Sequence, residues 1–92
     1  MIKSFKSADT RRLFNDENVP KFRNIQQPAR RKLLMLHATK KLTDLMFPHG
    51  NRLHALKGDR EGQHSISISD QWRICFVWKE ADAYDVEIVD YH

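Results

Sequence analysis

A chain of 92 residues is long enough for one domain, and we expect a single domain spanning residues 1–92. A domain of this size buries only a modest core, which argues against a deep, enclosed small-molecule cavity and favours a site at the surface. Hydrophobic residues make up 40% of the chain and the net charge is +4. This composition excludes a disordered chain, and no apolar stretch approaches the length needed to span a membrane.

The charge is distributed unevenly along the chain. Residues 1–60 contain 14 Lys and Arg against 5 Asp and Glu, whereas residues 61–92 contain 2 against 7. A basic half suits a polyanionic partner. A solvated helical surface would show the same excess, so charge alone leaves both interpretations open.

The first half of the chain predicts helices. Residues 2–5 form a short strand candidate, and Ser7 is a suitable N-cap for a helix over about residues 8–15. Residues 15–27 are polar, contain a proline and predict a connecting segment. Two apolar side chains in this segment are expected to anchor it to the core: Phe22 and Ile25.

The clearest helical pattern begins at Pro28, a residue that suits the first turn of a helix. Neither glycine nor proline interrupts the chain from there to Met46, so we predict one long helix over residues 28–46. The expected apolar stripe is listed in chain order: Leu33, Leu34, Leu36, Ala38, Leu42 and Leu45.

The second half predicts strands. Residues 64–69 alternate strictly between polar and apolar side chains, as a half-buried strand does. Residues 72–78 and 84–91 form two more strand candidates, and the short connections between them imply antiparallel neighbours. Trp72, Ile74, Phe76 and Trp78 share one face of the middle strand. The predicted fold is α+β, with two N-terminal helices packed on a small, mostly antiparallel sheet in the order β-α-α-β-β-β.

The single cysteine, Cys75, excludes an intrachain disulfide framework and lies between apolar neighbours, so we expect it to be a buried side chain. A signal peptide is not expected, because residues 1–6 are not followed by an apolar run. Together these features predict a cytoplasmic protein.

A first group of candidate functional residues lies in the segment 51–60. This segment contains His54, Lys57 and two guanidinium groups, on Arg52 and Arg60. Such a set suits a phosphodiester, whose negative charge must be bound and increases in the transition state. A solvated basic loop is the alternative interpretation.

Arg73 is the second candidate, because it lies in what should be a central strand. A buried arginine normally needs an anionic partner. That partner would be either a carboxylate on the neighbouring strand (Asp85, Glu87 or Asp90) or a phosphate that the guanidinium binds. The sequence does not decide between them.

The chain ends on a carboxylate, a phenol and an imidazole: Asp90, Tyr91 and His92. Cleavage of RNA by its own 2′-hydroxyl needs a base, an acid and cations that stabilise the phosphorane, and in principle no metal. His54 and His92 would serve as acid and base, and Lys57 would hold the phosphate together with the strand arginine. Tyr91 would stack or hydrogen-bond, and Asp90 would orient an imidazole.

The remaining histidines are weaker candidates, although His64 begins a strand close to the loop and could border the site. No cluster has the spacing of metal ligands, and no glycine-rich phosphate loop is present. We therefore expect neither a metal nor a cofactor.

These motifs resemble the HigB-type toxins of the RelE/ParE toxin–antitoxin superfamily. The matching segments are residues 1–5, the loop 51–62, the strand 71–76 and the ending 90–92. The resemblance implies a small microbial-ribonuclease-like fold and metal-independent cleavage of mRNA in the ribosomal A site, leaving a 2′,3′-cyclic phosphate and a 5′-hydroxyl. The residues implied as functional are His54, Lys57, Arg73, Asp90, Tyr91 and His92, with Arg52, Arg60 and His64 facing RNA.

The resemblance also implies partners. These are the ribosome with bound mRNA and a HigA-like helix-turn-helix antitoxin. The toxin would be linked to operator DNA only indirectly, through the antitoxin. The ParE branch of the superfamily instead inhibits DNA gyrase without catalysis, which is the alternative function. The set of His54, Arg73 and His92 argues against that branch, because a pure gyrase inhibitor needs no acid–base pair.

Overall fold

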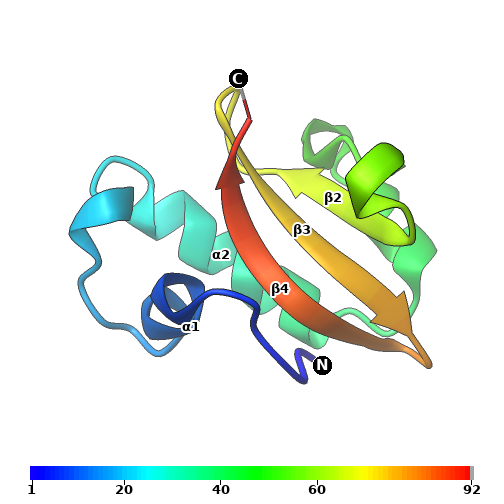
Figure 1. Ribbon diagram of the computed structural model, residues 1–92, viewed down its shortest axis with the longest axis horizontal. Coiled ribbons are helices and arrows are strands. Elements are labelled where there is room, and N and C mark those ends of the chain that lie inside the picture. Colours follow the sequence, from blue (N-terminus) through cyan, green and yellow to red (C-terminus); the bar gives the residue numbers. More distant parts are fainter. Residues whose placement is uncertain (92) are drawn as a thin grey trace.

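A computed structural model of the chain describes residues 1–91 and shows an α+β fold. Two α-helices lie against a four-stranded antiparallel sheet with the strand order β1-β2-β3-β4 (Figure 1). Helix α2 lies behind the sheet in Figure 1 and α1 lies beside the edge strand β4, while residues 42–60, which contain β1 and three short 3₁₀ turns, flank β2 at the other edge. The predicted fold class is confirmed.

Helix α1 spans Ala8–Phe14, close to the prediction. Ser7 caps it, since its side chain accepts a hydrogen bond from the backbone nitrogen of Thr10 at 3.2 Å. The side chain of Thr10 in turn accepts a hydrogen bond from the backbone nitrogen of Ile88 at 3.0 Å. This buried contact ties the first turn of α1 to the last strand.

Helix α2 spans Gln26–Ala38, so the prediction of one helix reaching Met46 is wrong. Thr39 adopts an extended conformation, and its hydroxyl donates to the carbonyl of Met35 at 2.7 Å. This side-chain bond satisfies a carbonyl that the next helical turn would have used. Residues 42–46 then form a separate 3₁₀ turn, η2.

The buried residue Asn51 holds the segment after η2 in place. Its side-chain nitrogen donates to the carbonyls of Leu45 and Phe47 at 3.1 and 3.2 Å, and Lys32 of α2 donates to its side-chain oxygen. Asn51 closes the 3₁₀ turn η3 (His49–Asn51). The candidate site begins with the residue directly after this turn. The hydrogen bonds of the Asn51 side chain therefore fix the position of the first site residue, Arg52.

The sheet consists of β1 (His54–Ala55), β2 (Gln63–Ser67), β3 (Trp72–Lys79) and β4 (Asp82–Asp90). The last three strands were predicted within a few residues. Strand β1 was not, because two residues cannot show an alternating pattern. The opening residues make only isolated parallel bridges to β4, Ile2 with Ala83 and Phe5 with Val86.

The two faces of the sheet differ in what covers them. One face, here called the helix face, carries Ile66, Ile74, Phe76 and Ile88, which join the core with α2 residues Ala29, Leu33 and Leu36. The predicted anchors Phe22 and Ile25 are also buried. Leu34 is 58% exposed, so its place in the predicted apolar stripe is wrong. The buried residues of α2 are Ala29, Leu33 and Leu36, so Leu34 lies on the other side of the same helix, away from the sheet.

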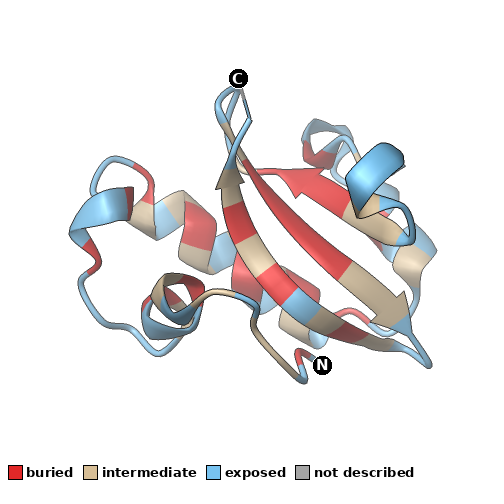
Figure 2. Cartoon of the chain, in the orientation of Figure 1, coloured by how far each residue is buried: buried red, intermediate tan, exposed pale blue. Residues whose placement is uncertain are grey.

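The opposite face, here called the site face, carries Ser65, Arg73, Cys75 and Glu87, which the strand register places on one side. The run Arg73–Phe76 is buried throughout, so β3 is covered on both faces at its centre (Figure 2). Within residues 1–91, no helix is both long enough and apolar enough to cross a membrane.

Candidate active site

Arg73 lies near the start of β3 with its side chain on the site face, and it is only 7% exposed. Its Nε donates to the hydroxyl of Ser65 on β2 at 2.9 Å. Its Nη2 donates to the carbonyl of Arg52 at 2.8 Å and lies 3.5 Å from the carbonyl of Ser65. The guanidinium is therefore held by two neighbouring segments of chain.

The acceptors that hold Arg73 are all neutral. Within residues 1–91 no carboxylate forms an ion pair with it, and Glu87 pairs instead with Arg60 at 3.2 Å. One of the two predicted alternatives was a structural salt bridge between Arg73 and a carboxylate of β4. Residues 1–91 do not form this salt bridge. Burial lowers the pKa of the Arg73 guanidinium from its ordinary value, but arginine stays protonated in proteins. Residues 1–91 thus give the largely buried positive charge of Arg73 no anionic partner.

His54 joins Arg73 through a shared acceptor. Its Nδ1 lies 3.2 Å from the carbonyl oxygen of Arg52 and 3.4 Å from Nη2 of Arg73. A carbonyl oxygen has two lone pairs and can accept from both groups. We assign the hydrogen of a neutral His54 ring to Nδ1, because that nitrogen then donates to the nearer, acceptor-only group. In this tautomer Nε2 keeps its lone pair.

Arg52 supplies this acceptor from an unusual backbone conformation. Its φ of 47° lies in the left-handed region, which few residues other than glycine adopt. Arg52 caps the 3₁₀ turn η3 at its C-terminal end, directly after the clamped Asn51. The guanidinium of Arg52 is exposed and pairs at 4.0 Å with the fully exposed carboxylate of Asp70. Arg52 therefore contributes to the site through its backbone carbonyl, which accepts from Nη2 of Arg73.

Tyr91 approaches the same guanidinium from the end of β4. Its ring centroid lies 5.6 Å from Cζ of Arg73, within the range of a cation–π contact, and its side chain is 48% exposed. Asp90 lies opposite Trp72 in the strand register, on the helix face, and its carboxylate accepts from Nε2 of Gln71 at 3.2 Å. The strand end thus brings Tyr91 to Arg73 and directs Asp90 to the other face.

The other predicted residues that the structure describes lie outside this cluster. Lys57 is exposed at the N-terminal boundary of the 3₁₀ turn η4 (Gly58–Arg60), and within residues 1–91 it forms no ion pair or side-chain hydrogen bond with the cluster. Arg60 is engaged by Glu87. His64 lies on the helix face, with its ring stacked on Phe76 at 6.2 Å. His92 falls outside the described residues.

The structure therefore brings together the imidazole of His54, the guanidinium of Arg73, the ring of Tyr91 and the carbonyl of Arg52. It adds Ser65, which the sequence analysis did not single out. The available signal was the alternation of residues 64–69, which places serines on one face of the strand beside Arg73. Hairpin register, which decides which serine meets the arginine, could not be read from that pattern.

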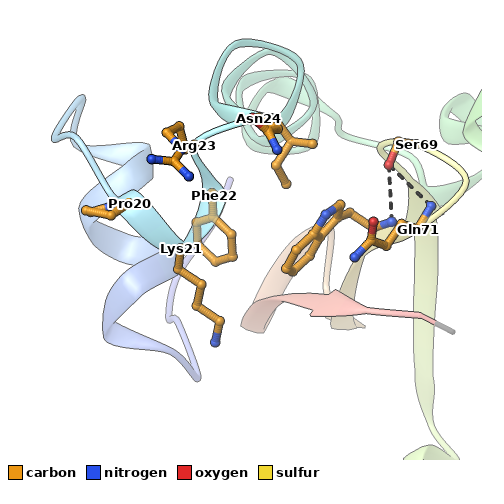
Figure 3. A pocket seen from close by; sticks show the side chains of 9 residues that line it. Pro20, Lys21, Phe22, Arg23, Asn24, Ser69 and Gln71 are labelled. Atoms are coloured by element: carbon orange, nitrogen blue, oxygen red, sulfur yellow. Dashed lines mark hydrogen bonds between the residues drawn. The ribbon is translucent and has the colours of Figure 1, made fainter.

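A separate cleft of about 260 Å³ lies between residues 20–25 and the turn that joins β2 to β3 (Figure 3). Phe22 and Trp72 meet edge to face inside it, with ring centroids 5.5 Å apart. Ser69 accepts from the backbone nitrogens of Gln71 and Trp72, which shapes the turn. Because successive strand residues point to opposite faces, this cleft is separate from the Arg73 cluster, and no predicted site residue lines it.

Comparison with known sequences identifies relatives. Residues 3–92 match the family described as the RelE-like toxin of the type II toxin–antitoxin system HigB. The endoribonuclease HigB of Proteus vulgaris is 51% identical over 41 residues, which is 45% of either chain. The toxin HigB-1 of Vibrio cholerae serotype O1 is 37% identical over 60 residues, 65% of this chain and 63% of that protein. The matched stretches thus cover less than two thirds of either relative.

Comparison with solved structures identifies the same fold in YafQ from E. coli. The wild-type protein superposes with a TM-score of 0.60 and a histidine-to-glutamine mutant with 0.62. Both are 11% identical in sequence, and the match covers 98% of this chain and 93% of theirs. At this identity the likeness establishes the fold.

Proposed function

The chain belongs to the HigB-like toxins, the RelE-like toxins of type II toxin–antitoxin systems, and we propose on that basis that it is an endoribonuclease that cleaves mRNA on the ribosome. Membership of this family implies an antitoxin partner. The name of the Proteus vulgaris relative supports nuclease activity. Within this chain, the observation that carries the proposal is the buried Arg73 guanidinium, whose protein partners in residues 1–91 are all neutral.

The proposed reaction is attack of the 2′-hydroxyl on the adjacent phosphorus. A bond forms between O2′ and phosphorus, and the bond between phosphorus and O5′ breaks. The products are a 2′,3′-cyclic phosphate and a 5′-hydroxyl. The role proposed for Arg73 is to stabilise the charge that accumulates on the phosphoryl oxygens, because a fixed charged donor outside bulk water acts most strongly there.

Two proton transfers accompany this exchange. With Nδ1 of His54 directed at the Arg52 carbonyl, its Nε2 is suited to take the proton of the 2′-hydroxyl. His92 is then proposed to donate a proton to the leaving O5′. Lys57 is proposed to contact the phosphate and Tyr91 to stack on the substrate. Asp90 is proposed to orient the imidazole of His92, because the strand register directs its carboxylate away from His54.

The proposed partners follow the same logic. The ribosome would supply the bound mRNA, and the basic residues of the first 60 positions suit contact with RNA. Arg52 and Arg60 are proposed RNA contacts at the edge of the site. The antitoxin is proposed to be a HigA-like helix-turn-helix protein, which would link the toxin to operator DNA indirectly.

Primer extension tests the proposal directly. Purified protein is added to ribosomes translating a defined mRNA and, in parallel, to the same mRNA without ribosomes. We expect new 5′ ends only in the first reaction. These ends should require phosphorylation before ligation, because cleavage leaves a 5′-hydroxyl.

Arg73→Ala and deletion of His92 should remove the new ends, while Arg11→Ala, which changes an exposed arginine on α1, should retain them. Persistent cleavage by both site variants would contradict the assignment of these residues. Inhibition of DNA supercoiling by the wild-type protein, without mRNA cleavage, would instead indicate a gyrase inhibitor.

A further inference from the structure

Ser65 is a polar side chain whose hydroxyl is directed at the proposed catalytic arginine. The residue lies in the middle of β2 with 0% exposure, opposite Cys75 in the register and therefore one step along the site face from Arg73. Its hydroxyl oxygen accepts from Nε of Arg73 at 2.9 Å, and within residues 1–91 this is its one side-chain hydrogen bond. A hydroxyl buried for packing alone would cost free energy that alanine avoids.

The bonds around Arg73 determine which edge of the guanidinium remains available. Nε is bound by the hydroxyl of Ser65, and Nη2 by the carbonyl of Arg52 at 2.8 Å. Nη1 forms no hydrogen bond with residues 1–91, and it is not among the buried unpaired polar atoms of that range. Nη1 is therefore the guanidinium nitrogen that residues 1–91 leave without a partner, and it can donate to an anion.

We propose that Ser65 is a positioning residue: together with the Arg52 carbonyl, its hydroxyl fixes the plane of the Arg73 guanidinium so that Nη1 meets the scissile phosphate. The proposal rests on the proposed nuclease function. An unrestrained arginine side chain loses rotamer entropy when it becomes ordered, and a donor ordered before the substrate arrives avoids that cost during the reaction.

The test compares two serines of the same strand and face. Ser65→Ala removes the acceptor, whereas Ser67→Ala removes a hydroxyl that donates to the carbonyl of Ser69 instead. We expect Ser65→Ala to lower kcat on programmed ribosomes roughly 10- to 100-fold, with KM within about twofold, because misplacement of a catalytic group by about 1 Å costs this much. Ser67→Ala should stay within about threefold in both constants.

A second readout is independent of catalysis. In NMR spectra the Nε–H of Arg73 should give a signal protected from exchange with solvent in wild type and in Ser67→Ala, and unprotected in Ser65→Ala. If Ser65→Ala does not fold, Ser65→Cys keeps a side chain of similar shape, slightly larger and with only a weak acceptor, and it should show the same losses.

The possible failures are distinguishable. A folded Ser65→Ala that cleaves within twofold of wild type, while Arg73→Ala is inactive, would overturn the role of Ser65 and leave the nuclease proposal intact. If Arg73→Ala itself cleaves normally, the catalytic role of Arg73 fails and the positioning role of Ser65 fails with it. Absence of ribosome-dependent cleavage by the wild-type protein would overturn the nuclease proposal itself. An unprotected Arg73 Nε–H in the wild-type protein would overturn the positioning contact, whatever the activity.

Discussion

The helix face and the site face of one sheet are built from alternate residues of the same strands. The helix face packs into the apolar core, whereas the site face holds the Arg73 guanidinium. On β3, Ile74 and Phe76 point into the apolar core, whereas Arg73 and Cys75 point the other way and are buried as well. The helix face gains stability from apolar contact. On the site face, desolvation of the Arg73 guanidinium, whose partners are neutral, offsets part of that stabilisation.

The difference shows how a 92-residue chain can hold a charged group rigidly. A small domain has little stability in reserve, and a buried charge without an opposite charge is costly. Here the central strand is anchored by the helix face, so the arginine can be held by hydroxyl and carbonyl oxygens alone. Arg52, in a left-handed conformation with φ of 47°, adds local backbone strain next to the same group.

The largest expected effect lies on the helix face. Phe76→Ala should lower the free energy of unfolding by about 3–5 kcal/mol, because it leaves a cavity at a fully buried position. Cys75→Ala, at the adjacent buried position on the site face, should cost far less. Urea denaturation measures both, and equal losses would show that the two faces contribute alike.

Arg73→Met should separate activity from stability. We expect mRNA cleavage to fall on the order of 10²–10³-fold, as for removal of one donor to a developing charge. The free energy of unfolding should stay unchanged or rise, since an apolar side chain replaces a desolvated charge. A loss of stability above about 2 kcal/mol would mean that Arg73 mainly holds the fold together.

Thr10→Val tests the polar contact that supports the helix face from α1. The substitution removes the acceptor of the buried backbone nitrogen of Ile88. It should cost about 1–3 kcal/mol of stability, because the nitrogen is left without a partner. Thermal unfolding measures the loss, and amide exchange at Ile88 should accelerate. A matching loss of cleavage by the folded variant would contradict the separation of the two faces.

The smallest effect is a pH dependence on the site face. Burial raises the pKa of the Cys75 thiol, so the folded protein holds this proton more tightly than the unfolded chain, whose cysteine pKa is about 8.5. The resulting stabilisation is complete below that pH and is lost as the pH rises above it, by at most about 1.4 kcal/mol per unit. Unfolding of wild type and Cys75→Ala at pH 7 to 10 should show a steeper decline in wild type.

Much of this fold could be predicted from the chain because its patterns are local. The alternation over residues 64–69 and 72–78 identified two strands, and Ser7 marked the start of α1 correctly. The long helix was wrong at its C-terminal end, where the hydroxyl of Thr39 and the distant side chain of Asn51 redirect the chain. Contacts between residues far apart in the chain produce no periodic pattern of apolar residues, so the sequence does not reveal them.

The candidate site divides in the same way. The residue types at positions 54, 57, 73 and 92 were enough to propose phosphodiester chemistry, because cleavage by the 2′-hydroxyl needs an acid, a base and cations that bind the phosphate. Whether Arg73 met a carboxylate or remained available to an anion depended on strand register, which placed Glu87 beside Cys75 and left it to Arg60. A shift by one residue would have reversed that outcome.

The sequence by itself determined three of the four strands (β2, β3 and β4), the buried character of β3 and the identity of the reactive groups, since these follow from side-chain chemistry and short-range spacing. The tertiary structure alone decided that Ser65 and the Arg52 carbonyl hold Arg73, that His54 shares this acceptor, and that His64 faces the core instead. The physical reason is that hydrogen bonds are formed by atoms within about 3 Å of one another, and only the folded chain brings residues from three separate segments to that distance.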